Sequence, residues 1–193
     1  NLFSGNLLRI FCSVSVTTCW AISMYALYIY LGAALYSENR FTLSEIATAI
    51  IFYGIGAVIG SLTGGQLTDR FGEKKISKVT FIFLTLVLVC LGIFFTTSTW
   101  IYFLLFLWAL VGYAGFTSYK ARLAVEYPNE RGSVMAWNMT ALYIGITLGS
   151  MLGGFVISKW GYTILPYVCS IAAILSFVLS TQKVKETKTE STV

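Results

Sequence analysis

Apolar residues fill this chain in long runs, and charged residues fall near the ends of these runs, in the short segments between them and at the two ends of the chain. Each run is long enough to cross a bilayer as an α-helix, which takes about 20 residues. The pattern therefore predicts an all-α integral membrane protein with six transmembrane helices, forming one unit over residues 1–181. A disordered cytoplasmic tail is expected at residues 182–193. The expected spans are approximately residues 10–36, 43–67, 76–95, 100–119, 133–158 and 164–179.

Composition agrees with a membrane protein. Of the 193 residues, 57% are hydrophobic and 11% are charged, whereas a soluble domain is about one quarter charged. The chain contains no His, and its four Cys residues lie inside apolar runs at no metal-ligand spacing. Nothing resembles a nucleophile–base pair, so we expect no enzyme, no metal and no cofactor. The basic residues do not suggest nucleic acid as a partner.

The basic residues are distributed very unevenly across the predicted membrane. Of the 13 Lys and Arg residues, Arg40 and Lys159 fall on one side, and the other 11 fall on the side that holds both termini. Positive residues mark the cytoplasmic side. We therefore expect a multi-pass protein of the plasma (inner) membrane with both termini in the cytoplasm.

A glycine-rich segment occurs twice, at residues 56–72 and 145–161, with every glycine displaced by 89 positions. The charge distribution makes the two copies cross the membrane in opposite directions. The six spans are therefore predicted to be two three-helix repeats in inverted topology, a construction typical of secondary transporters.

Glycines four residues apart share one face of a helix and let another helix approach closely. One interpretation is static packing inside the six-helix unit, and the other is contact with a second six-helix half. The glycines concerned are Gly56, Gly60, Gly64, Gly145, Gly149, Gly153 and Gly154.

Five charges fall within residues 69–75, between the second and third predicted spans. This segment resembles the signature loop of the major facilitator superfamily, G-x-L-x-D-R-x-G-r-k, and departs from it at Glu73, where a basic residue is usual. The matching residues are Gly65, Leu67, Asp69, Arg70, Gly72, Lys74 and Lys75.

The resemblance implies half of a transporter, most similar to the carboxyl-terminal half of the twelve-helix drug–proton antiporter group. That group includes exporters of drugs, arabinose and purines, and hence proteins of multidrug resistance. The implied function is efflux of a small organic molecule by alternating access, with the proton gradient as energy source. The implied partner is an amino-terminal six-helix half, in the same chain of the full protein, or a second copy. Ser150 stands where the antiporter signature has proline.

In the superfamily the first and fourth helices of a half line the central cavity, and the second and fifth meet the other half. The resemblance therefore favours glycine stripes that face a second half. The aromatic and hydroxylic residues of this region suit an amphipathic or cationic molecule, although core packing or an interfacial belt is an alternative for each. No carboxylate lies at mid-span in this chain, so a proton carrier is expected in the other half. The candidate cavity residues are Trp20, Tyr25, Tyr28, Tyr113, Thr117 and Asn138.

Asp69 is an acid at a helix end that faces a basic cytoplasmic segment. We hypothesise that it pairs with Arg122 or Arg131 and latches one end state, the alternative being a loop with snorkelling cations. Two other functions remain open. The chain could belong to a facilitator or symporter for uptake of a sugar or metabolite, or it could be a self-contained six-helix dimeric channel or membrane scaffold.

Overall fold

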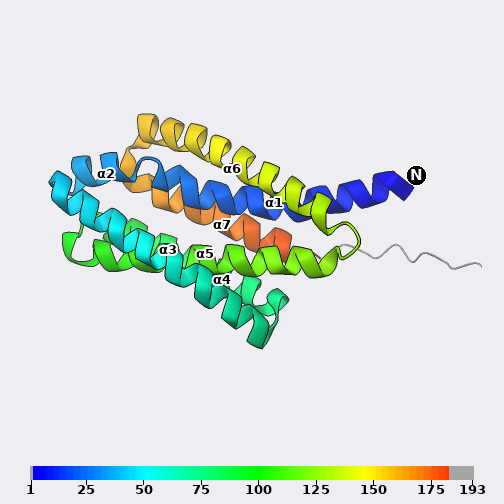
Figure 1. Cartoon of the computed structure of the whole chain (residues 1–193). Coiled ribbons are helices and arrows are strands. Elements are labelled where there is room, and N and C mark those ends of the chain that lie inside the picture. The colour runs from blue at the N-terminus through cyan, green and yellow to red at the C-terminus, as the bar shows by residue number, and fades with distance from the viewer. Residues whose placement is uncertain (1, 183–193) are drawn as a thin grey trace, which may run out of the picture.

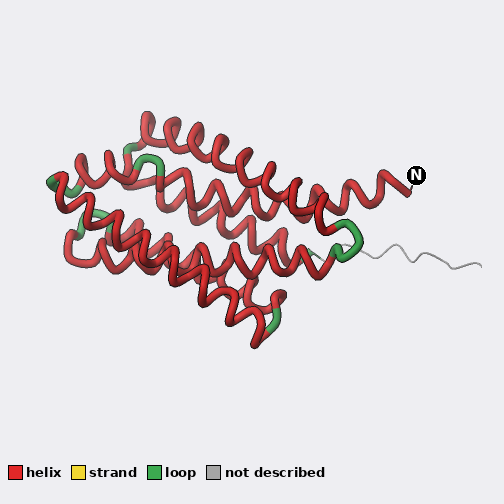
Figure 2. Tube along the Cα trace, viewed as in Figure 1, coloured by secondary structure: helices red, strands yellow, loops and turns green. Residues whose placement is uncertain are grey.

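A computed structural model describes residues 2–182 as a bundle of α-helices joined by short loops, with no strand in this part of the chain (Figures 1 and 2). The tail predicted at residues 182–193 lies outside the described residues, apart from Gln182. The elements are α1 (Leu2–Tyr28), α2 (Leu31–Glu38), α3 (Leu43–Phe71), α4 (Glu73–Phe94), α5 (Ser98–Glu126), α6 (Arg131–Trp160), the 3₁₀ turn η1 (Tyr162–Ile164) and α7 (Leu165–Thr181).

Six of these helices are long and apolar enough to cross a membrane, which confirms the predicted fold class. The first span differs from its prediction, because α1 ends at Tyr28 and the short α2 follows after a break. At the break the amide of Tyr30 donates to the carbonyl of Leu27 at 3.2 Å, a tighter turn than an α-helix has. The Tyr30 hydroxyl donates to the carbonyl of Ser150 on α6 at 2.9 Å. The break carries no Gly or Pro, so the apolar run concealed it.

The helix contacts have the symmetry of an inverted repeat. The helix α1 packs on α6 and α7, α5 packs on α3 and α4, and α4 packs on α7 (Figure 1). Exchanging α1 with α5, α3 with α6 and α4 with α7 leaves this set of contacts unchanged. The two predicted three-helix repeats are therefore present in the packing.

The glycine stripes pack inside the six-helix unit. A Cβ at Gly60 would collide with the carbonyl of Leu110 on α5, and a Cβ at Gly149 would lie 3.3 Å from the Cα of Ile22 on α1. The symmetry is precise to the residue. Phe106, Leu110 and Ala114 face the glycines of α3, and Thr18, Ile22 and Ala26, each 88 positions earlier, face those of α6.

This packing corrects the expectation that both stripes face a second half. Backbone contact with α5 and α1 buries all six stripe glycines, Gly56, Gly60, Gly64, Gly145, Gly149 and Gly153. The opposite faces of α3 and α6 are exposed and apolar instead, with Val58 62% and Met151 68% accessible. Those faces are suited to lipid or to another apolar surface.

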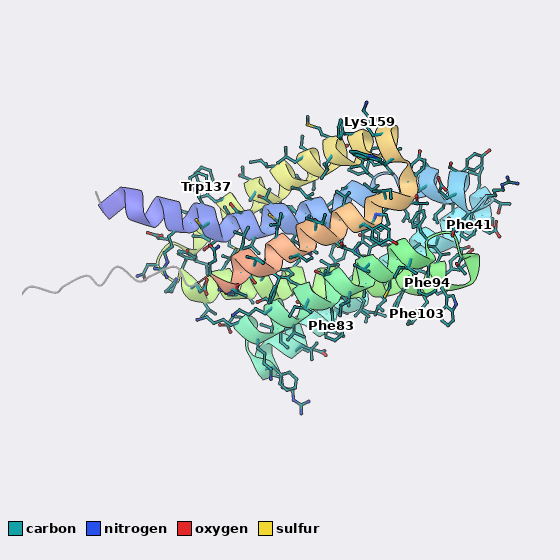
Figure 3. The ribbon with its side chains drawn as sticks, turned by 180° about the vertical axis from the view of Figure 1, so that it is seen from behind. Phe41, Phe83, Phe94, Phe103, Trp137 and Lys159 are labelled. Carbon is teal, nitrogen blue, oxygen red and sulfur yellow. The ribbon has the colours of Figure 1, made fainter. Side chains whose placement is uncertain are left out.

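The ends of α3 and α6 are also matched. Gly72 and Gly161 follow them with φ of +86° and +82°, a conformation that L side chains rarely adopt. Lys159 and Phe41 lie toward the same end of the bundle, the end opposite to the start of α1 (Figure 3). The segment with Arg40, just before Phe41, therefore shares an end with Lys159, as the charge distribution predicted.

Candidate functional site

The aromatic residues of α1 and α5 form one packed cluster. The Trp20 ring on α1 stacks on Phe116 of α5, with centroids 4.3 Å apart and planes 8° apart. The rings of Tyr113 and Tyr25 stand nearly perpendicular to the same indole, with their centroids 5.9 and 6.4 Å from its centroid. Contacts of these kinds add stability beyond the burial of apolar area. The cluster therefore joins the two central helices of the repeats.

A third helix contributes to this cluster through Tyr53 of α3. Its ring stacks on that of Tyr28, with centroids 4.7 Å apart. The centroids of the Trp108 and Tyr113 rings lie 5.0 and 6.3 Å from that of Tyr53. The seven residues that we call the aromatic cluster are Trp20, Tyr25, Tyr28, Tyr53, Trp108, Tyr113 and Phe116.

The polar atoms of the cluster are unequally satisfied. The indole N–H of Trp20 donates to the carbonyl of Gly112 at 2.9 Å. Tyr53 and Trp108 are 4% and 0% exposed, yet the Tyr53 hydroxyl and the Trp108 indole nitrogen have no hydrogen-bond partner within residues 2–182. Buried polar groups in native proteins are usually paired. The Tyr53 hydroxyl and the Trp108 indole N–H are therefore two polar groups of the cluster that, within the described residues, are left free to form a hydrogen bond.

Only part of the cluster is accessible. Trp20 and Trp108 are buried, whereas Tyr25, Tyr113 and Phe116 are half-buried and Tyr28 is 36% exposed. Thr117 is half-buried on the same stripe of α5 as Tyr113. We call Tyr25, Tyr28, Tyr113, Phe116 and Thr117 the aromatic surface.

Five of the six predicted cavity residues thus fall in or beside this cluster, and Asn138 does not. Asn138 is fully buried on α6 and accepts a hydrogen bond from Thr17 of α1 at 2.6 Å. Its side chain packs α6 against α1, and it is not part of the aromatic surface.

Tyr53, Trp108 and Phe116 were not predicted from the sequence, although a signal for two of them exists. Residues 20–28 read Trp-Ala-x3-Tyr-Ala-x-Tyr, with Leu27 before the last position, and residues 108–116 read Trp-Ala-x3-Tyr-Ala-x-Phe. The offset is 88, the same as that of the residues that face the glycines. The aromatic cluster is therefore itself part of the repeat. Tyr53 has no such signal, because Leu142 occupies the position 89 residues later.

A shallow groove of about 400 Å³ lies along the exposed face of α6. Its lining comes from that helix alone: Thr140, Tyr143, Ile144, Thr147 and Leu148. One helix supplies no convergent polar groups, so we do not place the functional site there.

The hypothesised latch is not formed through Arg122. The Arg122 Nε donates to Glu126 at 2.8 Å, and its Nη1 donates to the carbonyl of Ser180 at the end of α7, also at 2.8 Å. This is the single ion pair within residues 2–182. In this conformation Arg122 therefore anchors α7 to α5, while Asp69 and Arg131 are exposed at helix ends.

Comparison with known proteins identifies a family that this chain matches. The profile of the Major Facilitator Superfamily matches residues 10–192. The uncharacterized MFS-type transporter YwfA of Bacillus subtilis (strain 168) is 30% identical over 86% of this chain, and the match covers 40% of YwfA. The probable galactarate/D-glucarate transporter GudP of the same strain is 34% identical over 78% of the chain and 35% of GudP.

A solved structure supports the same fold. The crystal structure of the POT family transporter PepTSo superposes on 89% of this chain and 36% of its own length, with a TM-score of 0.75 and 17% identity. The chain therefore spans less than half the length of each of these three proteins.

Proposed function

Because this chain belongs to the major facilitator superfamily, we propose that it is one six-helix half of a secondary transporter that works by alternating access. Its relatives are transporters, and no covalent chemistry is proposed. The observation that carries the proposal is the repeated aromatic motif of α1 and α5. Two symmetry-related helices bring Trp20, Tyr25, Tyr113 and Phe116 together, part buried and part accessible. Such a surface can hold an organic ring by stacking.

We further propose that transport is export coupled to the proton gradient, with a drug-like, sugar-like or nucleoside-like substrate. The partner would be an amino-terminal six-helix half or a second copy, within a lipid bilayer. The carboxylates of the described helices lie toward helix ends, as Glu45 and Glu126 do. The partner half would therefore carry the proton. The termini, with the signature loop at Gly72, would face the cytoplasm.

Uptake is the second candidate function. It is favoured by GudP, the relative at 34% identity that is named a probable galactarate/D-glucarate transporter. The same fold can serve export or uptake, because alternating access is reversible and the net direction depends on the gradients and on whether substrate and proton move in the same or in opposite directions.

Flux measurements separate these proposals. The protein would be reconstituted in proteoliposomes with a pH gradient imposed in each direction, using ethidium, arabinose, inosine and D-glucarate as probes. Export by proton exchange predicts saturable accumulation of a probe on the acidic side. Symport predicts accumulation on the alkaline side. Ionic conductance without saturable flux would contradict a transporter and support a channel.

The matched variants are Phe116→Ala, in the aromatic surface, and Tyr36→Phe, on the 67%-exposed side chain of α2. Phe116→Ala should reduce flux at least tenfold, because it removes one face of the stack. Tyr36→Phe should leave flux unchanged.

A further inference from the structure

A cation lies at the edge of the aromatic surface. The Nζ of Lys120 is 5.4 Å from the centroid of the Phe116 ring, and that ring is stacked on Trp20 at 4.3 Å. Other cation–π pairs within residues 2–182 involve the rings of Phe71, Tyr119 and Tyr127. Lys120 is therefore the cation that reaches a ring of the aromatic surface.

Lys120 also shares the accessible face of α5 with this surface. Tyr113, Phe116, Thr117 and Lys120 are spaced by three or four residues, so they follow one stripe of the helix, and all four are half-buried. Long side chains of a helix lean toward its N-terminus. This direction brings the ammonium group over Phe116, away from the end of α5 at Glu126.

No acid within residues 2–182 forms an ion pair with Lys120. The nearby carboxylate on α5, Glu126, is bound by Arg122 at 2.8 Å, and this is the one ion pair of the described residues. An ammonium group partly withdrawn from water interacts strongly with an anion, because the effective dielectric constant falls. A positive potential is therefore expected over the ring of Phe116.

We infer that Lys120 is a substrate-recognition residue and that the transported molecule is an organic anion. Its acidic group would pair with the Lys120 ammonium, and its ring or carbon skeleton would lie on Phe116 and Tyr113. This inference rests on the proposed function, because it uses the aromatic surface as the substrate site. It narrows the substrate class, since a cationic molecule would meet a like charge at this position. A lysine whose ammonium group only reached the membrane surface would not discriminate between anionic and cationic substrates.

Chemical labelling tests the positive electrostatic potential near Lys120, and it does not require the substrate to be known. Thr117→Cys places a thiol one turn from Lys120, in a background where the accessible Cys12, Cys19 and Cys90 are replaced by Ser. The full protein in membranes is labelled with an anionic (sulfonatoethyl) and a cationic (trimethylammonioethyl) methanethiosulfonate, and rates are normalised to those of a free thiol. The anionic reagent should react faster. Lys120→Gln should lower the anion-to-cation rate ratio about tenfold.

Two further variants control this test. Lys120→Arg keeps the charge and should keep the ratio. Lys159→Gln removes a cation from the opposite end of the bundle and should leave the ratio unchanged (Figure 3). A ratio insensitive to Lys120→Gln would overturn the role of Lys120 and leave the transporter proposal standing. Absence of labelling of the Thr117→Cys thiol from both membrane sides would overturn the accessible aromatic surface, and with it both proposals.

Protection from labelling tests the substrate class itself. Phenylacetate and phenylacetamide have the same ring and nearly the same shape, and only the first is an anion. Phenylacetate should slow the labelling of the Thr117→Cys thiol at least fivefold more than phenylacetamide does, and Lys120→Gln should abolish the difference. Equal protection by the two compounds, or protection by neither, would contradict an organic-anion site.

Discussion

The indole N–H of Trp20 donates a hydrogen bond to the carbonyl of Gly112 at 2.9 Å, joining the central helices of the two repeats. Trp108 occupies the matching position 88 residues later, and Met24 matches Gly112. The reciprocal bond does not form, because the Trp108 indole nitrogen has no partner within the described residues. The two repeats thus share a motif but differ in their hydrogen bonding.

This asymmetry predicts that the same substitution lowers the free energy of unfolding by different amounts at Trp20 and at Trp108. Trp20→Phe and Trp108→Phe remove the same volume from buried positions, but only the first breaks a hydrogen bond. Trp20→Phe should therefore lower the free energy of unfolding by about 1 kcal/mol more than Trp108→Phe does. Unfolding by sodium dodecyl sulfate in detergent micelles measures both. Equal losses would mean that the Trp20 bond contributes nothing.

The glycine stripes make a second prediction. An alanine Cβ at Gly60 would collide with backbone atoms of Leu110, whereas a Cβ at Gly54 on the same helix meets nothing within 4 Å. Gly60→Ala should destabilise the protein by about 1–3 kcal/mol through overpacking. Gly54→Ala should be neutral or stabilise by up to roughly 1 kcal/mol through helix propensity. Thermal unfolding of the two variants checks this, and a neutral Gly60→Ala would refute the close contact of α3 with α5.

The break between α1 and α2 depends on Tyr30 in this structure. Tyr30→Phe removes the bond to the Ser150 carbonyl but keeps the ring beside Gly153, so it should cost about 1 kcal/mol. It should also speed hydrogen exchange of the amides of α2, which would lose their tie to α6. Tyr36→Phe, on an exposed side chain, is the control. Unchanged exchange in Tyr30→Phe would show that the break is held by other contacts.

Arg122 provides a test of the contact between α5 and α7. Arg122→Gln loses both the Glu126 pair and the bond to the Ser180 carbonyl, so we expect a loss of about 1.5 kcal/mol. Lys74→Gln, on an exposed side chain, should change the unfolding free energy by less than roughly 0.5 kcal/mol. Should the two variants lose the same stability, Arg122 would not anchor α7.

Asp69→Asn addresses what remains of the latch hypothesis. Asp69 has no ion pair within residues 2–182 in this conformation, so the variant should retain its stability. A pairing of Asp69 with Arg131 in another state would appear as a changed accessibility, during transport, of the membrane side that carries these two residues. Unaltered transport and accessibility would exclude the latch.

Much of the fold could be predicted, because a membrane span has a strong length and polarity signature. Six spans and their inverted order followed from apolar runs, from Lys and Arg placement and from one glycine motif. The break at Tyr30 could not be predicted, since it depends on a bond to Ser150, 120 residues away. Likewise, the spacing of the glycines does not show which helix packs on Gly60 and which on Gly149, because that depends on the tertiary structure.

The candidate site was predicted less completely. Trp20, Tyr25, Tyr28 and Tyr113 were identified, and the structure brings them together. Asn138 lies apart from them, and this could not be predicted, because a polar residue entering a helix looks the same in the sequence whether it faces a cavity or bonds a neighbour such as Thr17. Tyr53 was missed because its role depends on how α3 packs against α5.

In the proposed alternating access, the symmetry-related Tyr25 and Tyr113 would line a path that opens to each side of the membrane in turn. The decisive measurement is the labelling of Tyr25→Cys and Tyr113→Cys with a membrane-impermeant maleimide, in right-side-out and inverted vesicles of the background in which Cys12, Cys19 and Cys90 are replaced by Ser. We expect both thiols to react from both sides, and we expect reversal of the pH gradient to shift the labelling rates at the two sides in opposite directions. Reaction from one side only, whatever the gradient, would contradict alternating access through this surface.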